Sequence, residues 1–431
     1  MKSIKKIVAL LLTAVLLCGC ASEAATESTT PDYSQYAGIV ADPKSWYEEL
    51  MALPIANADM TEDELRQLCA DAFRLNLSFT WTPTKTIAFG FTLLEKSYSA
   101  VLPEGIAYSG LFYNNNTAQG NVWKALDFYD PETGTLDNEA MGGYMMNILG
   151  SACARGALWG WGRVCNESNL DGMTTFQQYS ANIVPVGPYN YPPGKYALSH
   201  GDGTKRLVAD NGRQTMFESY AAMKTADGLY SSSAYHVMMC AAPGEVVCTS
   251  DGTIDSRESY IFVHEQSSGG TLTQRYNFIQ ENGVVMRPLG TVFQKVTFEQ
   301  LYRNGYVPFA LKELIGEGTI EPGNAWLEDS DGVRLENGMR ITIQEMLAST
   351  LRTNYAVCTF EFQVKNPKGK VLFTYDPRFM TSPTTYKIQL HNISMPEEVE
   401  TYANGRNTIH TYVRMSNGEL LEAFQTVLII D

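Results

Sequence analysis

The sequence has little of what usually binds metals or nucleic acids. Only five of its 431 residues are histidine, and no two of its eight cysteines form a CxxC pair. A structural zinc site is therefore not expected, and we expect no cofactor. Basic residues are also scarce, since 32 lysines and arginines face 47 aspartates and glutamates, a net charge of −15. Because nucleic acids bind through basic patches, this balance argues against a nucleic-acid partner.

Long apolar runs are scarce as well. The most apolar run, residues 7–17, is too short for a permanent membrane span, and no later stretch is long enough. This run follows three lysines and ends in small residues before Cys20, a pattern typical of a secretory signal. Its end resembles the lipobox of bacterial lipoproteins, in which the cysteine is acylated and the chain is cleaved in front of it.

The lipobox resemblance implies a signal peptide over residues 1–19, a lipid on Cys20, and membrane attachment through that lipid only. The alternative is an ordinary cleaved signal with a cysteine present by chance. Residues 20–40 are small, polar and acidic, and we expect a flexible tether because they offer too little apolar surface to fold. The mature protein is then extracytoplasmic and lipid-anchored, on the cell surface or the periplasmic side of the membrane.

The rest of the chain is too long for one ordinary core, and its patterns predict an α+β protein with two folded parts. Residues 41–75 carry apolar side chains at helical spacing and a capping-box pattern at Thr61 and Glu64, which predicts an N-terminal helical segment. Residues 144–164 are apolar and rich in small residues, which predicts a buried helix that begins near Gly150 and Ser151. Residues 318–431 hold short β-rich runs between turns, which predicts an all-β sandwich of immunoglobulin-like type.

Three features of the middle part fit the chemistry of a cysteine hydrolase. Cys153 lies near the start of the small-residue helix, where free N–H groups and the helix dipole favour a thiolate and can hold an oxyanion. His236 opens an apolar strand and can accept the thiol proton. His264 and Glu265 end the next strand, where one of the two can orient the imidazole.

The middle part also resembles the NlpC/P60 and CHAP branches of the papain-like cysteine peptidases, which act on peptidoglycan stem peptides. Residues 105–110 (GIAYSG) are similar to the tyrosine-containing turn of these families, and residues 151–156 (SACARG) to the start of the nucleophile helix. Residues 236–239 (HVMM) are similar to the strand that the catalytic histidine opens, and residues 223–227 (MKTAD) to its approach. The resemblance implies a papain-like fold over residues 41–317 and a cysteine peptidase or amidase that cleaves peptidoglycan stem peptides.

The resemblance also implies a role for each residue. Cys153 attacks the carbonyl carbon, His236 transfers the proton, and the Tyr108 hydroxyl helps the Cys153 N–H to hold the oxyanion. CHAP domains place the third member of the triad at Glu265, and NlpC/P60 domains place it at His264. We favour Glu265, because the preceding residues on its face of the strand are apolar and only one of two neighbours can face the site.

The chain departs from the family pattern beside the nucleophile. Ala152 and Ala154 stand where the families have an acidic residue and a serine that help to bind the free amine of the stem peptide. Arg155 either binds a substrate carboxylate or lies in solvent. These departures support the alternative of a catalytically inactive papain-like lipoprotein that binds peptide or glycan at the cell surface. Cys240 and Cys248 can also face each other across a hairpin, where export permits a disulfide.

Overall fold

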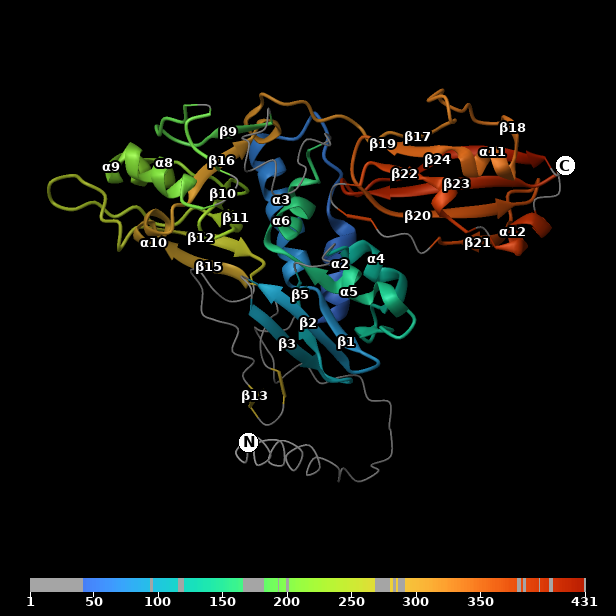
Figure 1. Cartoon of the computed structure of the whole chain (residues 1–431), viewed down its shortest axis with the longest axis horizontal. Coiled ribbons are helices and arrows are strands. Elements are labelled where there is room, and N and C mark those ends of the chain that lie inside the picture. Colours follow the sequence, from blue (N-terminus) through green and yellow to red (C-terminus); the bar gives the residue numbers. More distant parts are fainter. Residues whose placement is uncertain are drawn as a thin grey trace, which may run out of the picture. The chain divides into compact units, whose positions relative to one another are not determined.

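The chain folds as a mixed α+β protein with strands in several sheets, as predicted (Figure 1). Within the part of the chain described below, no helix combines the length and the apolar character needed to cross a membrane. The predicted signal peptide, the predicted lipidation site Cys20 and the predicted tether lie outside the described residues. The computed structural model describes residues 42–93, 96–114, 120–165, 182–192, 194–198, 201–267, 280–281, 284–285, 291–377, 381–382, 385–394, 396–402 and 406–429.

The predicted N-terminal helical segment consists of two helices, α2 (Pro43–Ala52) and α3 (Glu62–Leu77). They are separate because Pro54 lacks an N–H, and the residue before a proline disfavours helical geometry. Leu53 is accordingly extended, with φ −57° and ψ 128°. The capping box is confirmed: the Thr61 side chain accepts from the Glu64 N–H, and the Glu64 carboxylate accepts from the Thr61 N–H.

Short elements connect α3 to the candidate nucleophile. They form a four-stranded sheet in the order β4-β1-β7-β6, a β2–β3 hairpin and a parallel β5–β8 pair. These elements are β1 (Thr80–Pro83), β2 (Ile87–Leu93), β3 (Lys96–Leu102), β4 (Tyr108–Ser109), β5 (Phe112–Tyr113), α4 (Val122–Ala125), η2 (Leu126–Phe128), β6 (Tyr129–Asp130), β7 (Thr135–Leu136), η3 (Gly142–Tyr144), α5 (Met145–Leu149) and β8 (Gly150–Ser151).

The buried helix predicted to begin near Gly150 and Ser151 is found, and it begins at Cys153. Helix α5 ends at Leu149, and β8 then pairs with β5 before α6 (Cys153–Trp161) begins. Gly150 permits this pairing, because a Cβ there would meet the Met146 carbonyl oxygen at 2.3 Å and the Asn114 side chain at 2.9 Å. The interruption makes Cys153 the first residue of its own helix.

A six-stranded antiparallel sheet forms the centre of the middle part, in the order β15-β12-β11-β10-β16-β9. Helices α3 and α6 cover one face, and α8, α9 and α10 cover the other (Figure 1). Its strands are β9 (Ile183–Pro185), β10 (Gly228–Ser231), β11 (His236–Ala242), β12 (Tyr260–Glu265), β15 (Thr291–Thr297) and β16 (Val307–Leu311). The other elements of this part are α8 (Gly203–Asn211), α9 (Arg213–Ala221), the pair β13 (Gln280–Glu281) and β14 (Val284–Val285), α10 (Phe298–Arg303) and η4 (Lys312–Ile315).

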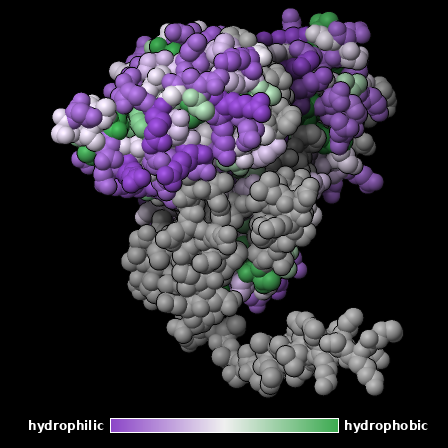
Figure 2. Space-filling view, turned by 60° about the vertical axis from the view of Figure 1, so that its left-hand side comes forward, coloured by the Kyte–Doolittle hydropathy of each residue, from purple (hydrophilic) through white to green (hydrophobic). Residues whose placement is uncertain are grey.

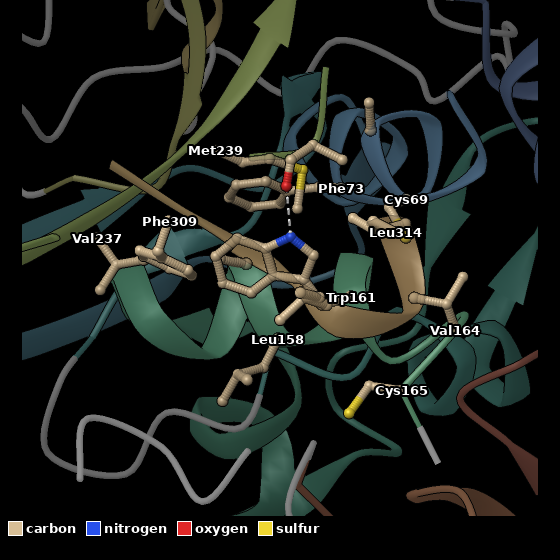
Figure 3. Close-up of a cluster of buried hydrophobic side chains, with 14 of the residues drawn as sticks. Cys69, Phe73, Leu158, Trp161, Val164, Cys165, Val237, Met239, Phe309 and Leu314 are labelled. Atoms are coloured by element: carbon tan, nitrogen blue, oxygen red, sulfur yellow. Dashed lines mark hydrogen bonds between the residues drawn. The ribbon is translucent and has the colours of Figure 1, made fainter. Parts of the chain in front are cut away.

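The two faces of this sheet are packed in separate cores, which explains why β11 is apolar almost throughout. Val237 and Met239 lie in the core beneath α3 and α6, whereas Met238 and Cys240 lie in the core beneath α8, α9 and α10. In the first core the Trp161 indole N–H donates to the Ala226 carbonyl at 2.8 Å (Figure 3). His236 and Glu265 belong by alternation to the second face.

The C-terminal part has two sheets around one core, in the orders β17-β19-β22 and β18-β24-β23-β20-β21. The prediction that this part is all-β is wrong in detail, because α11 (Ile343–Ala348) and α12 (Glu397–Tyr402) interrupt the strands. A capping box between Thr342 and Glu345 starts α11. The remaining elements are β17 (Ala325–Glu328), β18 (Arg340–Thr342), β19 (Thr350–Thr353), β20 (Val357–Lys365), β21 (Val371–Tyr375), β22 (Lys387–Gln389), η5 (Leu390–Asn392), β23 (Thr408–Met415) and β24 (Leu420–Ile429).

The predicted domain boundary between residues 317 and 318 falls between η4 and β17, and both sides belong to one compact unit, Tyr33–Asp431. Buried polar contacts cross it: the Asn121 side chain donates to the Cys358 carbonyl at 2.7 Å, and Arg163 donates to the Asn417 carbonyl at 3.0 Å. On the face shown in Figure 2, most of the described surface is hydrophilic, and apolar residues form only small patches.

Candidate active site

The candidate nucleophile is placed by the start of α6. The parallel pairing of β5 with β8 sets Tyr113 opposite Ser151, two residues before Cys153. No side chain caps the N-terminus of α6, since the N-cap residue is Ala152. The first N–H groups of the helix therefore remain available, and that of Ala154 helps to lower the pKa of Cys153. Cys153 itself is 5% exposed.

His236 reaches the sulfur from the first position of β11. The Cys153 sulfur and the His236 ring are close enough that each shifts the pKa of the other, and the Val237 N–H helps to lower the pKa of Cys153. The sulfur lies 3.8 Å from the carbonyl oxygen of Tyr235, the residue before the histidine. The helix start and the strand start thus meet at one point, although 82 residues separate Cys153 from Tyr235.

Glu265 completes the arrangement from the last position of β12. Its Oε2 lies 2.7 Å from Nε2 of His236, and its side chain is fully buried. With Nε2 facing the carboxylate, Nδ1 is the ring nitrogen that remains for the thiol. The three groups therefore converge in the order sulfur, imidazole and carboxylate.

The partners of Cys153 and His236 oppose the effect of burial on the pKa values of these two residues. Burial alone raises the pKa of Cys153, but the His236 hydrogen bond and charge, with two backbone N–H groups, hold that pKa below the ordinary value. Burial lowers the pKa of His236, but the hydrogen bonds and charges of Cys153 and Glu265 raise it by more than burial lowers it. Both shifts favour the pair of a thiolate and an imidazolium, the form in which a cysteine attacks.

Other buried cysteines lack such partners. Burial raises the pKa of Cys69, Cys240 and Cys358 above the ordinary thiol value. Cys240 and Cys248 are free thiols, so the disulfide that the sequence allows between them is not formed. The depressed pKa of Cys153 thus distinguishes it from thiols that are equally buried.

His264, the alternative third member, lies elsewhere. Its ring contacts Phe73 of α3 and Phe293 of β15, with ring centroids 6.0 Å and 5.1 Å away, and its Nδ1 has no hydrogen-bond partner. Burial and the charge of Arg74 lower the pKa of His264 to about 3. Of the two neighbours proposed for the orienting role, the structure brings Glu265 to His236 and turns His264 to the face covered by α3.

The tyrosine found beside the sulfur is Tyr113, which the sequence analysis did not single out. Burial and the charge of Cys153 raise the pKa of Tyr113, so its phenol stays protonated and can donate a hydrogen bond. Tyr108 is fully buried against Trp81, and its hydroxyl donates to the Pro103 carbonyl at 3.4 Å. The parallel pairing of β5 with β8 is a contact between distant segments, and the local sequence gives no signal for it.

Two more side chains, Gln266 and Arg155, lie on the elements that carry the site. Gln266 follows Glu265 and donates from Nε2 to the Leu111 carbonyl at 2.8 Å, which ties the end of β12 to the segment that carries Tyr113. Arg155 is half-buried on α6, two residues after the nucleophile. Within the described ranges, no group of three or more histidine, cysteine or acidic side chains is placed to hold a metal ion.

The geometry supplies a nucleophile, a base, an orienting carboxylate and N–H donors at a helix start, which is the equipment of nucleophilic catalysis on an acyl group. No protein-family model matches the chain, and no curated protein is significantly similar to it.

Proposed function

We propose that the protein is a cell-envelope cysteine hydrolase of papain-like type that cleaves amide bonds in peptidoglycan stem peptides. The single observation that carries the proposal is the convergence of Cys153, His236 and Glu265: the sulfur lies 3.8 Å from the carbonyl oxygen of the residue before His236, and the His236 ring hydrogen-bonds Glu265. A papain-like arrangement is supported by a helix that begins at the nucleophile and packs on an antiparallel sheet that carries the other two members. The substrate class rests on the resemblance to NlpC/P60 and CHAP peptidases and on the predicted lipoprotein signal.

In the first half of the reaction, the Cys153 thiolate attacks the amide carbonyl carbon, and the carbonyl oxygen becomes an oxyanion. The Cys153 N–H at the start of α6 and the Tyr113 phenol are the donors proposed to stabilise that charge. His236 then gives its proton to the leaving amine, the C–N bond breaks, and a thioester remains on the sulfur. Glu265 stabilises the imidazolium and holds the ring toward the sulfur.

In the second half, His236 is neutral and takes a proton from a water molecule, which attacks the thioester carbon. The C–S bond breaks, the carboxylic acid leaves, and the thiolate and imidazolium are restored. One water is consumed for each amide cleaved. Because the same imidazole serves as acid and then as base, activity requires that it gain and lose its proton in each cycle.

A second candidate function is a papain-like lipoprotein that binds peptide or glycan without cleaving it. Ala152 and Ala154 favour it, because the side chains that help these families to bind the stem peptide's amine are absent. The convergence of the three groups favours the hydrolase, since a binding surface has no need to depress the pKa of a buried thiol.

The test uses the mature protein and purified peptidoglycan sacculi, with release of soluble fragments as the readout. Cys153→Ala should lower the rate by about 10³-fold or more while the melting temperature changes little. Cys240→Ala, which removes a buried thiol from β11, the strand that His236 opens, is the matched control and should keep the activity. At pH 6.5, iodoacetamide should alkylate Cys153 and leave Cys69, Cys240 and Cys358 unmodified. Sacculus binding without fragment release, and an unreactive Cys153, would establish the binding function instead.

A further inference from the structure

The turn that leads into His236 contains a residue with an unusual backbone conformation. Residues 232–235 connect β10 to β11, whose pairing ends with Ser231 opposite His236. The last turn residue, Tyr235, has φ +50°. Glycine or asparagine usually occupies this region, because a Cβ there crowds the following carbonyl oxygen. A bulky aromatic side chain at such a position costs stability unless the surroundings impose it.

The surroundings do impose it, through the serines of the turn. The Ser231 hydroxyl accepts from the Ala234 N–H at 3.1 Å and donates to the Asn304 carbonyl at 2.6 Å. The Ser232 N–H donates to the Thr204 hydroxyl at 3.0 Å, and its own hydroxyl donates to the Gly201 carbonyl at 2.8 Å. These bonds tie the turn to α8 and to the segment after α10, so the residues that precede Tyr235 are held in place.

The Tyr235 side chain gains little from this position as far as the fold is concerned. It is 45% exposed, one of the large apolar side chains on the surface, whereas His236 beside it is buried. Its carbonyl oxygen is the atom that lies 3.8 Å from the Cys153 sulfur. A strained backbone therefore presents an exposed aromatic ring at the residue that adjoins both the nucleophile and the base. Strain that the fold does not need is a feature of functional sites.

We propose that Tyr235 is a substrate-binding residue of the hydrolase, and this inference rests on the proposed function. Its ring forms a wall beside Cys153 and packs against a neutral, apolar group next to the scissile amide. A tyrosine ring offers a large contact area with few rotatable bonds, so it binds at a low entropic cost. The turn around it, residues 231–235 (SSSAY), has no charged side chain, which favours a neutral group over a charged one.

Phe293 provides a matched control. It is the other exposed aromatic residue with positive φ in the described ranges, at +52° and 50% exposure. Its ring adjoins His264, which faces α3 rather than the candidate site. Phe293→Asn and Tyr235→Asn therefore remove the same kind of ring from the same kind of backbone, since asparagine accepts positive φ. The two variants differ in their position relative to the nucleophile.

The experiment compares alkylation of Cys153 by iodoacetamide and by N-benzyl-iodoacetamide, which carries an apolar group beside the same reacting carbon. In the wild type the benzyl reagent should react faster. Tyr235→Asn should lower the ratio of the two rates by about 3- to 10-fold, the size of one aromatic contact. Tyr235→Phe, which keeps the ring, should recover most of the loss, and Phe293→Asn should leave the ratio at the wild-type value. In fragment release from sacculi, Tyr235→Asn should raise KM more than it lowers kcat.

The possible failures are distinguishable. If Cys153 reacts readily but Tyr235→Asn leaves both the alkylation ratio and KM unchanged, the role of Tyr235 is wrong and the hydrolase stands. An equal slowing of both reagents would assign Tyr235 to the structure of the site rather than to binding, and would also overturn the inference. If Cys153 is inert in the wild type, the hydrolase and the inference fall together.

Discussion

Two buried histidines on neighbouring strands of the same sheet have pKa values that are shifted in opposite directions. His236 is 5% exposed and His264 is 1% exposed, so burial hardly distinguishes them. His236 has a carboxylate and a thiol as partners, and its pKa is raised. His264 lies between aromatic rings with an unpartnered Nδ1, and its pKa falls to about 3. Partners rather than depth in the protein therefore decide the charge of a buried imidazole.

The same contrast holds between the two faces of the sheet. The face beneath α8, α9 and α10 has a polar end at His236 and Glu265, where the buried charges are paired with each other. The face beneath α3 and α6 is packed with apolar side chains, and His264 lies on this face beside Phe73. Of these two neighbours on β12, His264 thus contributes to packing and Glu265 to the proposed chemistry. Three experiments would break or sharpen this comparison.

The largest expected effect comes from exchanging the histidines one at a time. His236→Gln removes the proposed acid and base and should lower kcat/KM for fragment release by about 10³-fold. His264→Leu is the matched variant, and it should keep kcat/KM within about threefold, because a neutral imidazole without partners has no part in the proton transfers. A large loss in His264→Leu with a native melting temperature would contradict the assignment of the two faces.

The second effect concerns the carboxylate that raises the His236 pKa. Glu265→Gln keeps the shape and removes the charge, and kcat should fall by about 10²-fold. The imidazolium then loses the anion that stabilises it, so His236 releases its proton at a lower pH. The alkaline limb of the kcat/KM profile should therefore shift to lower pH. An alkaline limb that stays in place would show that Glu265 does not control the charge of His236.

The smallest effect is on stability and comes from His264. Its native pKa of about 3 lies below the ordinary value of 6.5, so at intermediate pH the unfolded chain binds a proton that the native state does not. Stability should therefore fall as the pH falls below 6.5, by about 1.4 kcal/mol for each pH unit. Between pH 6.5 and 5, urea unfolding should show about 2 kcal/mol more loss in the wild type than in His264→Leu. Parallel pH dependences would mean that His264 is protonated inside the native protein.

Part of the architecture could be predicted because it is local. The Thr61 capping box, the strand that His236 opens and the β-rich runs after residue 325 depend on neighbours a few positions away. The break between α2 and α3 at Pro54 is also a local signal, but the helical spacing on both sides conceals it. By contrast, α6 begins at Cys153 because β8 pairs with β5, a contact between segments far apart in the chain.

The candidate site shows the same division. Alternation along β12 is enough to place His264 and Glu265 on opposite faces, and the apolar residues that precede Glu265 indicate its face. Tyr113 could not be found in this way, because its position beside Cys153 follows from a parallel pairing that leaves no pattern in either segment. Tyr108, which the family resemblance favoured, packs instead against Trp81.

The sequence by itself determined the elements, their alternation and the residue types able to do acyl chemistry, because these depend on covalent order and on period. Only the tertiary structure decided that a sulfur, an imidazole and a carboxylate meet within hydrogen-bonding reach. It also decided their charges, since a pKa is set by the burial and the partners that distant segments supply.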